Sequence, residues 1–238
     1  PSNSTSSTFG TVVIGGNGYG NAANQVSSPQ KIIIDGSGNF YISSSTHKIY
    51  KFPSNSTSST DGTTFAGRGV WSGNANSLNE LWFPRGIVLD NSGRLYVTDL
   101  NNRIMRFPSD SYSGTNGTLF AGGNGYGSAL NQTTGYDLAI DGDENIFLAD
   151  IENHRILKFP SNSTSSTNGV VVAGGNGRGS ATNQFDRPWG ICFDNSGNFY
   201  VADYSNHRVQ KFFYNPSIVI AAGATSGTAV ISLPASGS

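Results

Sequence analysis

Three histidines are the first residues to consider for chemistry, because imidazole serves as a general base and as a metal ligand near neutral pH. They are His47, His154 and His207, and each precedes the same kind of short alternating segment. A zinc site needs ligands that converge, whereas equivalent positions of a repeat lie apart. The pattern therefore predicts a structural role in a hairpin for all three.

A second set of ionisable residues consists of aspartates that each end an apolar segment and stand shortly before an arginine. They are Asp99, Asp150 and Asp203. We expect each carboxylate to accept hydrogen bonds from backbone N–H groups or from that arginine. The first repeat has Ser44 and Ser45 at this place, so the carboxylates form no complete ring. A catalytic carboxylate pair stays open as an alternative.

Two further groups favour structure over chemistry. Asp141 and Asp143 match part of a calcium-loop spacing, but Ile146 stands where that loop requires glycine. Cys192 is the sole cysteine, which excludes an intrachain disulfide, and its apolar neighbours predict a small buried hydrophobe. We therefore expect no catalytic residue, no metal site and no cofactor.

Glycine-rich loops carry the best candidates for ligand binding. They recur once per repeat and no helical pattern follows them, so they do not match a dinucleotide-binding fingerprint; glycine there supplies positive φ. Aligning the loops places four residues at one position: Tyr19, Trp71, Tyr126 and Arg178. Flat rings flanked by Asn and Gly suit stacking on sugars. The alternative is that each ring covers the edge of the next sheet.

The elements that position these residues follow from a repeat of roughly fifty residues. The tract PSNSTSST occurs at 1–8, 53–60 and 160–167. Each unit contains a short apolar run that predicts a strand buried on both faces, an Asp/Asn-Gly turn, and a second strand. An alternating strand with its basic residues pointing out and an outer strand follow. Repeated four-stranded antiparallel sheets predict a β-propeller, because one sheet cannot bury both of its faces.

Residues 188–212 resemble the NHL repeat, including its Asn-His signature at Asn206-His207. Asn153-His154 is a second good copy, and Asn102-Arg103 and Thr46-His47 are weaker ones. The resemblance covers about residues 29–215 and implies a β-propeller. NHL propellers usually have more than four blades. Some NHL relatives are zinc lyases, and their dispersed histidine ligands have no counterpart in this sequence.

We predict a single all-β domain: a β-propeller of four NHL-type, four-stranded blades with extra strands at both termini. Residues 1–28 are expected to supply an N-terminal outer strand and an inter-blade loop, 29–223 the four repeats, and 224–238 a C-terminal strand or tail. The predicted repeats are 29–83, 84–135, 136–187 and 188–223.

The ends of the chain do not complete the repeat tidily. Residues 11–14 form an extra outer strand with no inner strands before it, and 218–220 and 228–232 both compete for the last outer position. An unpaired strand edge with little charge invites pairing with another molecule. We therefore expect the ends to link chains into assemblies. A closed four-blade ring and a truncated larger ring are the alternatives.

Composition narrows the partners and the compartment. Charged residues make up 12 % and the net charge is −1, which argues against nucleic acid and anionic membranes as partners. No segment is apolar and long enough to insert in a bilayer. No signal peptide is seen, so the chain is expected to be a processed product or part of a longer protein. Glycosylation sequons favour secretion: they are Asn3, Asn55, Asn116, Asn131 and Asn162.

The sequence thus predicts a non-enzymatic, extracellular, glycosylated propeller that acts as a self-assembling structural module or a binding module. Its expected partners are a second copy of the chain through terminal strand pairing, glycans, or extracellular proteins. A lectin-like glycan binder is one alternative. A lyase or lactonase is the other, and it rests on family resemblance alone.

Overall fold

The computed structural model describes residues 7, 9–70, 72–73 and 77–214. The described chain is all-β, with four antiparallel sheets and two short 3₁₀ helices. Each sheet is built from strands that follow one another directly along the chain. This confirms the all-β class and the repeated sheets predicted from the sequence.

The first three sheets each contain four strands. The first holds β1 (Pro29–Ile34), β2 (Phe40–Ser44), β3 (Lys48–Phe52) and β4 (Thr63–Gly67). The second holds β5 (Ile87–Leu89), β6 (Leu95–Asp99), β7 (Arg103–Phe107) and β8 (Thr118–Gly122). The third holds β9 (Gly135–Ile140), β10 (Ile146–Asp150), β11 (Arg155–Phe159) and β12 (Val170–Gly174), with helix η1 (Ile151–Asn153) before β11.

The fourth sheet has three strands within the described residues. They are β13 (Pro188–Phe193), β14 (Phe199–Asp203) and β15 (Arg208–Phe212), with helix η2 (Tyr204–Asn206) before β15. The strands expected at 218–220 and 228–232, and the tail at 224–238, lie outside the described residues. The segment 11–14, which was expected to form a strand, pairs with no strand of the described residues.

Each first hairpin closes on a turn that an aspartate organises. In the second sheet, Asp90 Oδ1 accepts hydrogen bonds from the backbone N–H groups of Ser92 and Arg94, each at 2.9 Å. A carboxylate at this place fixes the turn by replacing the backbone partners that the chain lacks there. The same bonds recur at Asp35 and Asp194, so the repeated turn signal in the sequence has one structural cause.

The outer strands share a bulge at the same repeat position. In the third sheet, Ile156 pairs with Ala173 and Leu157 with Val171, so Val172 is skipped. The first and second sheets show the same register shift between their third and fourth strands. A bulge increases the local twist of a strand, which suits the rim of a fan of sheets.

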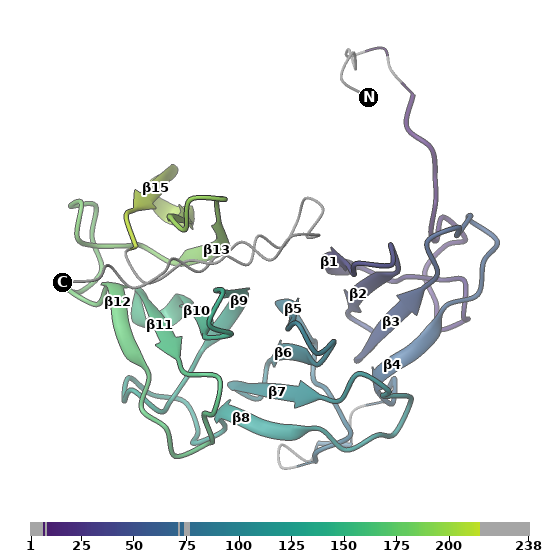
Figure 1. Ribbon diagram of the computed structural model, residues 1–238, viewed down its shortest axis with the longest axis horizontal. Coiled ribbons are helices and arrows are strands. Elements are labelled where there is room, and N and C mark those ends of the chain that lie inside the picture. Colours follow the sequence, from purple (N-terminus) through teal and green to yellow (C-terminus); the bar gives the residue numbers. More distant parts are fainter. Residues whose placement is uncertain (1–6, 8, 71, 74–76, 215–238) are drawn as a thin grey trace, which may run out of the picture.

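The sheets fan about a common centre as the blades of a propeller (Figure 1). β1, β5, β9 and β13 lie nearest the centre, and β4, β8 and β12 lie outside. The first and last blades stand at the two ends of an arc in this view. This arrangement confirms the propeller and the predicted radial order of strands.

The hydrophobic core lies between blades and not within them. Between the second and third blades, Tyr96 and Ile104 meet Leu148 and Leu157, all four fully buried. Equivalent clusters fill the two other junctions. At each of these three junctions, one face of a blade therefore packs on the facing side of the next blade.

Candidate functional site

The aromatic residues predicted for ligand binding are exposed. Tyr19 is 79 % exposed and Tyr126 is 71 % exposed, so neither ring covers a neighbouring sheet. Arg178 pairs with Asp186 (Nε to Oδ2, 3.0 Å) and keeps a largely exposed side chain. Trp71 lies outside the described residues. Sugar stacking by these loops stays a prediction, and exposure of the two tyrosine rings meets one of its requirements.

The asparagines beside these rings have structural partners. Asn124 Nδ2 donates to the carbonyl oxygens of Ser165 and Asn131, at 2.6 and 2.8 Å. Asn17 makes the equivalent bonds to Ser58 and Asn24. These Nδ2 groups fasten each loop to the next Ser/Thr tract, so the donors are engaged within the chain.

The predicted sequons lie at accessible places. Asn55, Asn116 and Asn162 are exposed and Asn131 is partly exposed, whereas Asn3 lies outside the described residues. Exposure is necessary for glycosylation, and the modification itself stays a prediction.

The histidines connect consecutive blades. His47 Nδ1 accepts a hydrogen bond from the backbone N–H of Phe83 (3.2 Å), and His154 Nδ1 accepts one from Arg187 (3.1 Å). Both residues have positive φ at the turn before the third strand. Burial lowers the pKa of His47, which favours the neutral imidazole over the charged one. The predicted hairpin role is therefore confirmed, and the described residues contain no cluster of potential metal ligands.

The aspartates that end the second strands are buried anchors for the inter-blade loops. Asp150 Oδ1 accepts from Thr134 N at 2.8 Å, and its Oδ2 accepts from Arg155 Nε at 2.7 Å. Arg155 also donates to the carbonyls of Ser128 and Ala129, at 2.8 and 2.9 Å. This confirms the predicted partners.

The first basic residue of the third strand does not point out, contrary to the prediction. Lys48, Arg103 and Arg155 are buried, because each reaches under the preceding loop to its carbonyl groups or carboxylate. In the second blade, burial raises the pKa of Asp99, and the guanidinium of Arg103 opposes that shift.

The preceding face of the first blade is incompletely covered. Ile32 is 55 % exposed, whereas the residue at its repeat position in the second blade, Ile87, is fully buried. Ile14 and Val26 from the N-terminal segment cover only the part of this face that lies farther from the centre. The expectation that the first strand is buried on both faces therefore fails here, because no blade of the described residues packs on Ile32.

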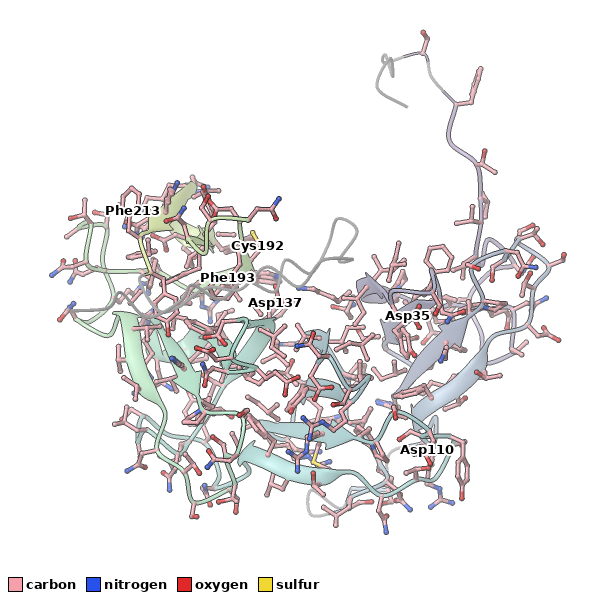
Figure 2. The ribbon with its side chains drawn as sticks, in the orientation of Figure 1. Asp35, Asp110, Asp137, Cys192, Phe193 and Phe213 are labelled. Carbon is pink, nitrogen blue, oxygen red and sulfur yellow. The ribbon has the colours of Figure 1, made fainter. Side chains whose placement is uncertain are left out.

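The following face of the last blade is also open. Val209 is 69 % exposed, whereas its equivalents Ile49, Ile104 and Ile156 are fully buried. Cys192 is exposed on the same face, although the sequence predicted a core residue. The reason is positional: Cys192 occupies a site that a following blade buries elsewhere in the chain, as at Ile33, Val88 and Ala139. Figure 2 shows Cys192 and Phe213 on this blade.

A cluster that the sequence analysis missed lies where the innermost strands begin. The Arg85 guanidinium lies 4.3 Å from the ring centroid of Tyr136, and the Trp189 ring is 4.0 Å from Tyr136 and 4.7 Å from Tyr204. Trp189 thus packs between β9 of the third blade and helix η2 of the fourth. The signal was available: aligned blades carry Gln30, Arg85, Tyr136 and Trp189 at one position, unlike residues in an otherwise uniform repeat.

A hollow of ≈ 350 Å³ lies beside the second blade, and its lining includes Trp82, Asn101 and Arg103. Its polar groups are engaged: Asn101 and Arg103 both donate to Asp99. Among the described residues, no helix has the length and apolar character needed to cross a membrane.

Comparison with known proteins agrees with this geometry. The NHL repeat model matches residues 81–103 and 185–212. A structural genomics protein of unknown function from Bacteroides thetaiotaomicron VPI-5482 is similar, with a TM-score of 0.58, 16 % identity, and coverage of 78 % of this chain and 47 % of that one. A streptogramin B lyase gives a TM-score of 0.48, 14 % identity, and coverage of 80 % and 54 %. The chain spans about half the length of these structures. The chain thus carries NHL repeats at two positions and has a β-propeller fold.

Proposed function

We propose that this chain is a non-enzymatic propeller module that assembles with a second copy of itself through its two open blade faces. The observation that carries the proposal is the contrast between equivalent residues. Ile156 is fully buried inside the arc, whereas Val209 and Ile32, one at each end, are 69 % and 55 % exposed. Full burial of an apolar side chain contributes roughly 1.5–3 kcal/mol of stabilisation, so burying these residues between two copies is favourable.

The N-terminal segment supports a head-to-tail arrangement. Residues 11–15 have the sequence pattern of a fourth strand, and Val12 and Val13 are 59 % and 44 % exposed. Gly15 has φ 74°, close to φ 73° at Gly122, which ends β8. Gly15 therefore shares the positive φ of a glycine that ends an outer strand.

The register of the complete blades says how this strand would pair. Extending the register of β11 with β12 places Gly15 of one copy opposite Arg208 of the next, and Ile14 opposite Val209. Within the described residues, no strand pairs with the outer edge of β15, and we place the N-terminal segment of the next copy at this edge.

An extracellular, glycosylated state and a glycan-binding role complete the proposal. The exposed sequons at Asn55, Asn116 and Asn162 support the first. The exposed rings of Tyr19 and Tyr126 favour the second. Glycan-array binding that is lost in Tyr126→Ala would support glycan recognition, and unchanged binding would contradict it. Elemental analysis tests the lyase or lactonase alternative: stoichiometric zinc or calcium would favour the enzyme.

Light scattering over a concentration series tests the assembly. We expect the mass of the wild type to exceed that of the monomer and to rise with concentration, and Val209→Asp to reduce it to the monomer. Val170→Asp is the matched control, because Val170 is 60 % exposed but lies on β12, on an outer strand. A wild type that stays monomeric at every concentration would overturn the proposal, as would equal effects of the two substitutions.

A further inference from the structure

The beginnings of the four innermost strands surround a small cavity at the centre of the fan. Its volume is ≈ 90 Å³, and its lining includes Lys31, Arg85, Tyr136, Asp137 and Trp189. These residues come from all four blades, and Figure 2 labels Asp137 near the centre of the arc. Ile32, Cys192 and Val209, which mark the open end faces, are not among its lining residues.

Two charged groups of this cavity already satisfy each other. Lys31 Nζ and Asp137 Oδ1 form an ion pair at 2.6 Å that connects the first and third blades. Asp137 also accepts hydrogen bonds from the backbone N–H groups of Leu138 (2.9 Å) and Ile191 (3.2 Å). Asp137 is therefore neutralised and fully engaged, and it does not offset a further positive charge.

That further charge is Arg85. Its guanidinium lies against the Tyr136 ring, and none of its N–H groups has a hydrogen-bond or ion-pair partner among the described residues. By contrast, Arg155 donates to one carboxylate and to two loop carbonyls. Arg85 is only partly exposed, and burial lowers its pKa. A desolvated guanidinium without acceptors is costly, and an oxyanion removes that cost.

We propose that this cavity binds the carboxylate of a small organic acid, with Arg85 donating two parallel N–H···O bonds. The planar fork of arginine matches a carboxylate in geometry as well as in charge. The volume of the cavity limits which part of the ligand can enter it. An enclosed cavity of about 150 Å³ holds a benzene ring, so ≈ 90 Å³ holds a carboxylate but not a ring. The body of the ligand must lie outside, against Trp189, which is 36 % exposed.

Calorimetric titration of the full chain with sodium benzoate at low salt and neutral pH tests this site. We expect binding to weaken by about 10- to 100-fold in Arg85→Gln, because a hydrogen bond to a charged group contributes about 1.5–3 kcal/mol. Arg85→Lys keeps the charge but loses the fork, and should bind with intermediate affinity. Arg106→Gln is the matched control: Arg106 is also partly exposed and lies over an aromatic ring, that of Phe120, on β7.

The outcomes decide between a carboxylate site, a general anion site and no site. Benzoate binding that Arg85→Gln weakens and Arg106→Gln preserves supports the proposal. Inorganic phosphate that binds as tightly as benzoate overturns the choice of a carboxylate. Absence of benzoate binding, or equal weakening by the two substitutions, overturns the site. If Arg85→Gln lowers the melting temperature markedly, the affinity of Arg85→Lys for benzoate is compared with that of Arg106→Gln instead. Arg85→Lys retains the charge and most of the side chain, so weaker binding by this variant supports the site and unchanged binding overturns it.

Discussion

Replacing Asp150 by serine should destabilise the propeller strongly, because it removes one half of a buried ion pair. The Asp150 side chain is fully buried and that of Arg155 is 8 % exposed. The first blade carries Ser44 and Lys48 at the equivalent positions, both buried. The substitution therefore places a serine opposite Arg155, whereas the serine of the first blade lies opposite a lysine.

The magnitude follows from what Arg155 retains. Breaking a buried pair costs about 3–5 kcal/mol, because it leaves an uncompensated charge. Arg155 keeps its bonds to the carbonyls of Ser128 and Ala129. We therefore expect a loss near the lower end, about 3 kcal/mol, which for a domain of this size lowers the melting temperature by about 6–12 °C. Asp150→Ser combined with Arg155→Lys should recover part of this loss, since it recreates the pair of the first blade.

Urea unfolding followed by circular dichroism measures these free energies in the single and double variants. Glu152→Ser is the control, because Glu152 pairs with Arg187 at 3.0 Å and both side chains are exposed (37 % and 50 %). Such a pair contributes about 0–1 kcal/mol. A loss below about 1 kcal/mol in Asp150→Ser, or a double variant no more stable than the single one, would refute this account of the anchor.

Three further outcomes are expected. Assembly should protect Cys192 from maleimide, and Val209→Asp should restore labelling; equal labelling rates would argue against a buried end face. Partial desolvation raises the pKa of Asp194, but hydrogen bonds from Asn198, Tyr200 and the turn backbone outweigh it and bring the pKa to about 2. Its folded-state pKa lies below the ordinary 3.8, so its stabilising contribution is present above pH 3.8 and is lost as the pH falls to about 2. Melting temperatures across this interval should fall less in Asp194→Asn than in the wild type. Gly122→Ala should destabilise by more than the roughly 1 kcal/mol expected for Gly125→Ala. Both glycines have positive φ, but an added Cβ meets the Asn102 carbonyl only at Gly122; equal melting temperatures would contradict this.

The sequence predicted the blades well because each blade is a local pattern. The turn at Asp90 and the antiparallel pairing of the second and third strands are encoded within a few residues, and the structure confirms both. The burial of Arg103 was missed, because its partners belong to a loop that precedes it by more than twenty residues. Alternation shows which face a side chain occupies but not what lies on that face.

The open ends and the central cavity were not predictable in the same way. Cys192 has the apolar neighbours of a core residue, and its exposure depends on a blade that does not pack on it. Arg85 and Trp189 lie about a hundred residues apart in the chain and line one cavity only after the fan forms. Both features depend on the spatial order of the repeats.

The recurrence of equivalent contacts at successive junctions has an evolutionary consequence. His47 and His154 bind the backbone of the next unit in the same way, and the clusters at successive junctions use equivalent side chains. A gene segment that encodes one unit can therefore be copied or removed, and the newly adjoining units still meet through compatible surfaces. Lineages carrying such a gene are expected to differ in the number of units, while the contacts at each junction between units stay the same.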